Sequence, residues 1–218
     1  DKFGEKPLYY SLQHGVFVFA SELTAIETLN GINLTIDRSA VSQQIQTSYI
    51  PAPLTIYNEV KKLEPGSFIE INTALEMKKG VYWSLSNEIG QAKRNLFTSE
   101  NEAVEQLESA LKKAVKLRMA SDVPLGGFLS GGVDSSLVVA LMQDQSTVPV
   151  NTFSIGFDVP GYNEAVYAKD VAKYLGTNHH EQYLSPQYAL DIVPSLGGMF
   201  DEPFSDASQI PTFLVSKM

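Results

Sequence analysis

The sequence predicts an α/β fold in which a parallel sheet forms the second part of the chain and a β-rich region precedes it. Three observations lead to this prediction. Apolar runs of strand length alternate with helical patterns from about residue 99 onwards, which is typical of βαβ units. A loop with two adjacent glycines separates one of these runs from the next helix. Before residue 85, short apolar runs joined by turn residues favour antiparallel hairpins.

The β-rich region should contain two pairs of strands and two helices. The expected elements are strands over 8–12 and 16–20 around a turn at 13–15, helices over 22–29 and from 37 to about 49, and strands over 68–71 and 77–83. Ser21 and Asp37 stand before the two helices, and their side-chain oxygens can accept hydrogen bonds from the first helical N–H groups. Pro51 and Pro53 end the second helix, because proline cannot donate to the helical ladder.

Residues 85–98 are polar and show no clear period, so we expect a linker between domains at 1–84 and 99–218. The second domain should begin with a helix, because Ser99 and Glu102 form a capping box ahead of apolar residues at helical spacing. The elements expected after it are a strand over 123–129, a helix over 135–142, a strand over 150–157, a helix over 164–175 capped by Asn163, a strand over 178–184 and a helix over 186–196.

The composition limits the classes of protein to which the chain can belong. Its 218 residues include 44% apolar side chains, enough for a folded core, and carry a net charge of −9, which argues against a nucleic-acid partner. There is no cysteine, so a disulfide framework, a thiolate zinc site and a cysteine nucleophile within this chain are excluded. Neither a membrane-spanning run nor a signal-peptide pattern is present, and we expect a cytoplasmic protein with no membrane partner.

The most specific pattern is Ser130-Gly131-Gly132-Val133-Asp134-Ser135-Ser136, between an expected strand and an expected helix. Glycine lets the backbone approach an anion closely, and the free N–H groups of a first helical turn attract negative charge. The loop lacks the lysine of a Walker A motif. An ordinary glycine-rich turn remains the alternative, but the complete motif in this context favours phosphate binding.

This loop resembles the pyrophosphate loop of the ATP-pyrophosphatase superfamily, whose members activate a substrate as an adenylate. Other segments resemble the glutamine-hydrolysing asparagine synthetases. These segments are Asp1–Tyr10, Phe19–Leu23, Tyr49–Pro53, Lys62–Gly66, Ser121–Gly126, Phe128–Ser130, Thr177–Glu181 and Asp201–Phe204. The resemblance covers nearly the whole chain. It implies that residues 1–84 are the C-terminal part of an N-terminal-nucleophile type glutaminase domain, and that 99–218 begin an adenine nucleotide α-hydrolase-like synthetase domain.

The resemblance also implies a set of site residues. The residues expected to bind ATP are Leu129, Ser130, Gly131, Gly132, Asp134, Ser135, Ser136 and Ile155. Asp134 is the expected Mg²⁺ ligand, with a helix N-cap as its alternative role. For Leu129 and Ile155 the alternative is a place in the core of the sheet. No catalytic residue is assigned, because the family's cysteine nucleophile has no counterpart here.

The activity that the resemblance implies is conversion of aspartate, glutamine and ATP to asparagine, glutamate, AMP and pyrophosphate through β-aspartyl-AMP. Two alternatives remain, a related amidotransferase acting on another carboxylate and a non-catalytic nucleotide-binding module. We expect the chain to be an internal fragment that is inactive alone. The oligomeric state is left open, with a homodimer as one option.

A few further residues carry charge or metal-ligating atoms. Glu202 and Asp206 belong to an acidic stretch that could either cap a helix or face the substrate. His179 and His180 are adjacent on an expected strand, so they should point to opposite faces and cannot chelate one metal together. Lys61 and Lys62 are expected to be solvated surface residues.

Overall fold

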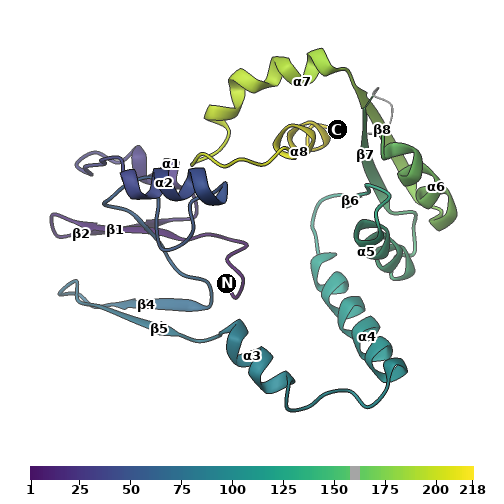
Figure 1. The fold of residues 1–218 in the computed structure, drawn as a ribbon, viewed down its shortest axis with the longest axis horizontal. Helices are drawn as coiled ribbons and strands as arrows, with labels where there is room; N and C mark the ends of the chain where they lie inside the picture. Colours follow the sequence, from purple (N-terminus) through teal and green to yellow (C-terminus); the bar gives the residue numbers. More distant parts are fainter. Residues whose placement is uncertain (158–162) are drawn as a thin grey trace. The chain divides into compact units, whose positions relative to one another are not determined.

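A computed structural model describes residues 1–157 and 163–218, and these form two compact units. The first unit comprises Asp1–Leu96 together with Ser195–Asp206. The second comprises Phe97–Pro194 together with Ala207–Met218. Figure 1 shows the elements of both units in chain order. Within the described residues no helix combines the length and the apolar character that crossing a membrane requires.

The strands of the first unit form two antiparallel sheets. They are β1 (Tyr9–Gln13), β2 (Val16–Ala20), β3 (Lys61–Lys62), β4 (Ser67–Ile71) and β5 (Met77–Val81). One sheet has the order β2-β1-β3, and the other is the β4-β5 pair. The expected hairpins are confirmed, with Tyr9 opposite Ala20 and Gln13 opposite Val16 in the first of them. Gly15 turns that hairpin at φ +75°, a backbone region that glycine adopts without steric cost.

Three helices complete the first unit. They are α1 (Leu23–Glu27), α2 (Arg38–Thr47) and α3 (Leu85–Ala92), and the last lies in the stretch 85–98 that was expected to be a linker. Leu23 and Ile26 of α1 pack against Tyr9 and Val60 in the core of the unit. Asp37 caps α2 as predicted, accepting hydrogen bonds from the first-turn amides. The predicted cap of α1 by Ser21 is wrong, because Glu22 occupies the N-cap position and makes no side-chain cap bond.

The second unit contains a parallel sheet, as predicted. Its strands are β6 (Gly126–Phe128), β7 (Asn151–Phe157) and β8 (Asn178–Leu184), in the order β6-β7-β8. Phe128 lies opposite Phe153, and Phe157 lies opposite Leu184. The strand predicted over 123–129 is shorter than expected, and it begins beyond Pro124, whose nitrogen cannot donate to a ladder.

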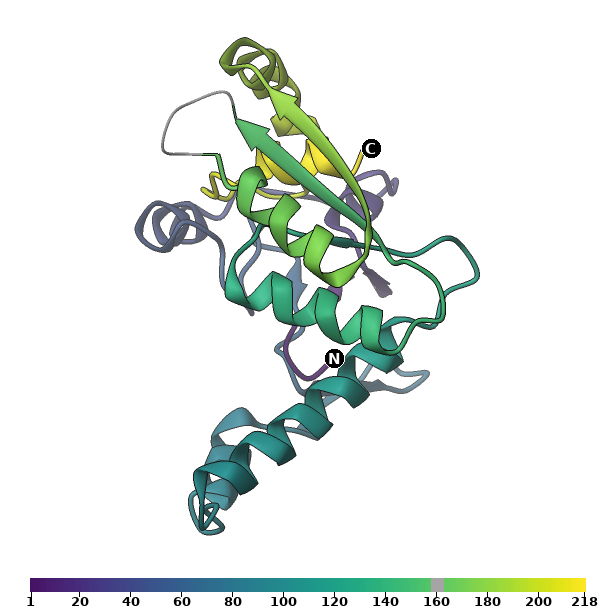
Figure 2. The same cartoon turned by 90° about the vertical axis from the view of Figure 1, so that its right-hand side faces the viewer.

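The helices of the second unit, within the described residues, are α4 (Glu100–Arg118), α5 (Val133–Asp144), α6 (Ala165–Leu175), α7 (Pro186–Ile192) and α8 (Gln209–Val215). Of these, α6 and α8 contact β7, α5 packs on Leu129 and on α6, and α4 packs on α5. A 3₁₀ segment over Val193–Gly198 leads out of the unit. Figure 2 shows α5 and α6 side by side over one face, with α8 on the other. The core on the first side contains Leu129, Val139, Ala168 and Ala172. The sheet is therefore flanked by α5 on one face and by α8 on the other.

Candidate functional site

The glycine-rich loop lies at the carboxyl edge of the parallel sheet, where open α/β sheets bind ligands. Leu129 extends β6 by one residue, since its amide donates to the carbonyl of Phe153 at 2.9 Å. The chain then turns through Ser130, Gly131 and Gly132, and α5 begins at Val133. The first N–H groups of α5 have no intrahelical acceptor, as in any α-helix, and Gly132 at the N-cap offers no side chain to accept from them.

Gly131 is the residue on which the loop conformation depends. Its φ is +80°, a value that favours glycine. A Cβ on Gly131 would come within 2.6 Å of the backbone nitrogen of Ala168 and 2.7 Å of Cβ of Tyr167, both in α6. Gly132, in contrast, has φ −72°, and the atom nearest to a Cβ added there would be Oγ of Ser130 at 3.4 Å. Gly131 thus lets the loop pack directly on α6, whereas Gly132 borders open space.

Serine hydroxyls hold the two sides of the loop together. Oγ of Ser130 lies 3.0 Å from Oγ of Ser135, and the amide of Ser130 donates to Oγ of Ser135 at 3.2 Å. The Ser135 hydroxyl also donates to the carbonyl of Gly132 at 3.2 Å. Oγ of Ser136 is different, because it is buried and has no hydrogen-bond partner. A buried hydroxyl without a partner is costly, and a ligand in the loop would give it one.

A cavity of about 380 Å³ adjoins the loop, and we call it the loop cavity. Its walls are Phe128, Leu129, Ser130, Ser135, Phe153, Ser154, Ile155, Phe157, Glu164, Ala165, Ser208, Pro211, Thr212 and Val215. Its volume is within the range of small-molecule sites, roughly 300–1,000 Å³. The walls combine aromatic and aliphatic side chains with hydroxyl groups at the loop end. This combination suits a ligand with a flat apolar part and a polar tail.

Four of the eight predicted site residues line the loop cavity, namely Leu129, Ser130, Ser135 and Ile155. Leu129 is only 2% exposed, and its carbonyl accepts a hydrogen bond from Oγ of Ser154. Pairing between β6 and β7 stops at Phe153, so the edge of β7 that faces β6 is open at Ile155. Leu129 therefore belongs both to the core of the sheet and to the cavity wall, whereas Ile155 is half-buried and lines the cavity from the strand edge.

Asp134 is exposed in the first turn of α5. It is not the N-cap residue, and no side-chain hydrogen bond caps this helix, so the structure does not give it the alternative capping role. Within the described ranges 1–157 and 163–218, no group of three or more His, Asp or Glu side chains is arranged to hold a metal. A single carboxylate fits Mg²⁺, which typically binds one or two carboxylates together with substrate phosphates.

The histidines of β8 point to opposite faces of the sheet, as predicted. His180 stacks on Phe153 with ring centroids 5.0 Å apart. Nδ1 of His179 lies 2.9 Å from Oγ1 of the buried Thr152, and Nε2 lies 3.7 Å from the carboxylate of Glu181. Burial lowers the pKa of His179, so the neutral ring is favoured. Both histidines have packing roles.

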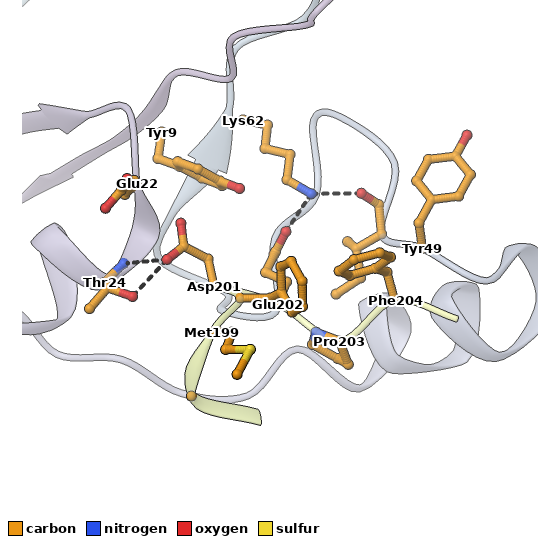
Figure 3. A pocket seen from close by; sticks show the side chains of 13 residues that line it. Tyr9, Glu22, Thr24, Tyr49, Lys62, Met199, Asp201, Glu202, Pro203 and Phe204 are labelled. Carbon is orange, nitrogen blue, oxygen red and sulfur yellow. Dashed lines mark hydrogen bonds and ion pairs between the residues drawn. The ribbon is translucent and has the colours of Figure 1, made fainter. Parts of the chain in front are cut away.

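A second cavity, of about 550 Å³, lies in the first unit and was missed by the sequence analysis. Lys62 and Glu202 in this cavity form an ion pair, and Asp201 accepts hydrogen bonds from Thr24, as Figure 3 shows. Lys62 contacts the Glu202 carboxylate at 2.5 Å and donates to the carbonyl of Ile50 at 2.7 Å. The prediction that Lys62 is a solvated surface residue is wrong, since its side chain is only 15% exposed. Glu202 is engaged in this ion pair and is not free to face a substrate.

Comparison with known protein families assigns both parts of the chain. Residues 106–218 match the asparagine synthase family. The chain belongs to the asparagine synthase family. Residues 1–83 match the glutamine amidotransferase domain. The family resemblance drawn from the loop and the other segments is therefore confirmed.

Two of the relatives are named as glutamine-hydrolysing asparagine synthetases, and a third is named as an amidase. A putative glutamine-hydrolysing asparagine synthetase of Methanocaldococcus jannaschii is 36% identical over the whole chain, which covers 42% of that relative. A glutamine-hydrolysing asparagine synthetase of Bacillus subtilis is 33% identical over the whole chain, which covers 33% of it. An amidase of Penicillium rubens is 28% identical over 83% of the chain. The chain thus spans less than half the length of these relatives.

Proposed function

We propose that the chain is part of an ATP-dependent amidotransferase that makes asparagine from aspartate, glutamine and ATP. The observation that carries this proposal is the loop, which has a glycine backbone and free helical N–H groups and whose Ser130 and Ser135 line a cavity of suitable size. The Ser136 hydroxyl, in the first turn of α5, has no hydrogen-bond partner. The names of the relatives support the choice of aspartate and glutamine as substrates. We place the reaction in the cytoplasm.

In this proposal the loop holds the pyrophosphate part of ATP. The residues assigned to it are Ser130, Gly131, Gly132, Ser135 and Ser136, with the free N–H groups at the start of α5. Leu129 and Ile155 contact the adenosine part from the sheet edge. Asp134 holds Mg²⁺, which when bound neutralises charge on the phosphate oxygens. The chain has a net charge of −9, so these local groups must offset the repulsion of a polyanion.

The chemistry that follows has two steps. The β-carboxylate of aspartate attacks the α-phosphate of ATP, so that the bond to the β-phosphate breaks and pyrophosphate leaves. The loop amides and serine hydroxyls stabilise the charge that accumulates on this leaving group. Ammonia released from glutamine then attacks the acyl carbon of β-aspartyl-AMP, giving asparagine and AMP.

The first unit has a different part in this proposal. Residues 1–84 are assigned to a glutaminase domain of the N-terminal-nucleophile type, in agreement with the match of 1–83 to the glutamine amidotransferase domain. This chain has no cysteine to act as a nucleophile, so its residues contribute scaffold to that domain. The linker at 85–98 and the synthetase domain at 99–218 complete the proposed organisation.

A product assay on the intact protein tests the proposal. Aspartate, glutamine, ATP and Mg²⁺ should give asparagine, glutamate, AMP and pyrophosphate in equal amounts. Omission of aspartate should stop the release of AMP and pyrophosphate, because no acyl group is available to attack ATP. Release of AMP without aspartate would favour an amidotransferase with another acceptor. Failure to bind ATP at all would favour a non-catalytic module.

A further inference from the structure

The larger cavity of the first unit, about 550 Å³ in volume, carries an excess of negative charge. Among the described residues that line it, the charged side chains are the carboxylates of Glu22, Asp201 and Glu202 and the ammonium group of Lys62. Three negative charges against one positive charge give these walls a net charge of −2, and we call this space the acidic cavity. A cleft whose walls carry one sign of charge concentrates ions of the opposite sign.

Two of the three carboxylates have no cation beside them. Glu202 forms an ion pair with Lys62. Within the described part of the chain, the donors to Asp201 are backbone amides and the hydroxyl of Thr24, which are neutral groups. Glu22 is exposed and makes no hydrogen bond or ion pair with any described residue. The negative charges of Asp201 and Glu22 are therefore available to a cationic ligand.

The hydroxyl of Tyr9 is an independent feature that points to a ligand. Tyr9 is only 6% exposed, and its ring packs in the core of the first unit. Figure 3 shows its hydroxyl pointing into the acidic cavity, between Asp201 and the ion pair of Lys62 with Glu202. This hydroxyl makes no hydrogen bond to any described residue, and a buried polar group without a partner is costly.

The phenol of Tyr9 is held in its neutral form. Burial raises its pKa, and the carboxylates of Glu202 and Asp201 act in the same direction. The neutral phenol oxygen still has lone pairs, so it can accept a hydrogen bond from an N–H group of a ligand.

Aromatic rings form the apolar part of the cavity wall. Phe200 and Phe204 meet edge to face with their ring centroids 4.8 Å apart, and Tyr49 adds a third ring. Such rings attract cations to their faces and also pack against alkyl groups. The wall thus suits a cation that carries an apolar chain.

We propose that the acidic cavity binds a primary alkylammonium ion, whose N–H group donates to the Tyr9 hydroxyl and whose charge is balanced by Glu22 and Asp201. The alkyl part packs against the rings of Phe200 and Phe204. A carboxylate or phosphate ligand would be repelled, because the cation of this wall, Lys62, is already paired with Glu202. The inference does not rest on the proposed function, since none of these residues is assigned to ATP.

Calorimetric titration of the intact protein with butylammonium chloride, without nucleotide, tests the proposal. Butylammonium should bind and butyrate, which has the same chain with a negative charge, should not. Tyr9→Phe should weaken binding about tenfold, the value of one hydrogen bond to a charged group. Tyr10→Phe is the matched control, since Tyr10 is equally buried on the same strand, but its hydroxyl contacts Lys79 at 2.6 Å and it does not line the acidic cavity.

The free carboxylate is tested in the same way. Glu22→Gln should weaken binding of butylammonium about threefold, which is typical of an exposed ion pair. Glu27→Gln makes the same change of charge at the end of α1 and outside the cavity, so it should bind like the unaltered protein. Added NaCl should weaken binding to the unaltered protein, because the attraction is between charges near the surface.

Thermal melts show which variants fold. If Tyr9→Phe fails to fold, Glu22→Gln still tests the proposal, because Glu22 is exposed and has no partner to lose. No binding of butylammonium by the unaltered protein, or equal binding of butylammonium and butyrate, would overturn the proposal. Unchanged affinity in every folded variant at Tyr9 and Glu22 would place the amine elsewhere and would also overturn it.

Discussion

The hydroxyl oxygens of Ser130 and Ser135 lie 3.0 Å apart across the loop between β6 and α5. This contact, with the bond from the Ser135 hydroxyl to the carbonyl of Gly132, fixes the width of the loop without a ligand. A loop that is already ordered loses little conformational entropy when an anion binds. The free amides at the start of α5 are therefore presented in a fixed arrangement.

Substitution of Gly131 should damage both the fold and the site. Gly131→Ala places a Cβ 2.6 Å from the backbone of Ala168 and forces a side chain into positive φ, which alone costs roughly 1–2 kcal/mol. We expect a lower free energy of unfolding in urea denaturation and loss of ATP binding. Gly132→Ala is the control, because the backbone of Gly132 has φ −72° and the added Cβ would contact only Oγ of Ser130, at 3.4 Å. Equal stability of the two variants would contradict this account of the loop.

A bulkier residue at Gly132 should separate folding from binding. Gly132→Val keeps an allowed backbone, and the nearest neighbour of its Cβ is Oγ of Ser130. The branched side chain would however occupy the space in which we place the pyrophosphate. We expect near-normal thermal stability with no measurable binding of ATP by calorimetry. Retained affinity would show that the phosphates do not approach Gly132.

Removal of the Ser136 hydroxyl should have opposite effects on stability and binding. Oγ of Ser136 is buried without a partner, and such a group costs roughly 1–3 kcal/mol. Ser136→Ala should therefore be at least as stable as the unaltered protein in a thermal melt. Its affinity for ATP should fall about tenfold, the value of one hydrogen bond to a charged group. A variant with lower stability and unchanged affinity would assign the hydroxyl to the fold.

Neutralising Asp134 should remove the effect of Mg²⁺ on nucleotide binding. Asp134 is exposed and does not cap α5 by a side-chain hydrogen bond, so Asp134→Asn should cost at most about 1 kcal/mol, through the helix dipole. Titration of ATP with and without Mg²⁺ should show a large difference in the unaltered protein and little in the variant. Asp170→Asn, on the exposed side of α6, should behave like the unaltered protein. An unchanged Mg²⁺ effect in Asp134→Asn would exclude this residue as the ligand.

Acidification should weaken the second unit through His179. Burial lowers the pKa of His179 from 6.5 in the folded state; His180 and Lys169 act in the same direction, and Glu181 opposes them. The unfolded chain therefore binds the proton first as the pH falls. Stability should be complete above about pH 6.5 and should be lost as the pH falls from there through the lower pKa of the folded state.

The variant His179→Gln should flatten this loss, as measured by urea denaturation between about pH 7 and about pH 5. His14→Asn is a suitable control, because His14 lies in an exposed turn of the first unit at φ 50°, which asparagine tolerates. The same pH dependence in His179→Gln and in the unaltered protein would assign the effect to other groups.

The sequence predicted correctly those elements whose ends or caps depend on residues that are close by in the chain. Strand β8 was predicted with its observed bounds, because its ends are marked by Gly176 and by Ser185-Pro186. Asp37 was recognised as a cap because its partners are the next amides along the chain. The position of the glycine loop at the edge of a parallel sheet followed from the alternation of strands and helices.

Contacts between distant parts of the chain could not be predicted in this way. Asp201 caps α1 from 178 residues away, so nothing near Leu23 signals it, and Ser21 was assigned a role that it does not have. A lysine is usually exposed, and the Lys62 side chain is buried because it pairs with the distant Glu202. Likewise, the sequence pattern does not show that α8 lines the loop cavity, since this depends on its packing against β7, a strand far earlier in the chain.

The central claim is that the phosphates of ATP bind in the loop before α5. The most direct test is a crystal structure of the intact protein with a non-hydrolysable ATP analogue and Mg²⁺. The account predicts phosphate oxygens within hydrogen-bond distance of the amides and hydroxyls of residues 130–136, with the base between Leu129 and Ile155. A bound analogue located elsewhere, with this loop empty, would contradict it.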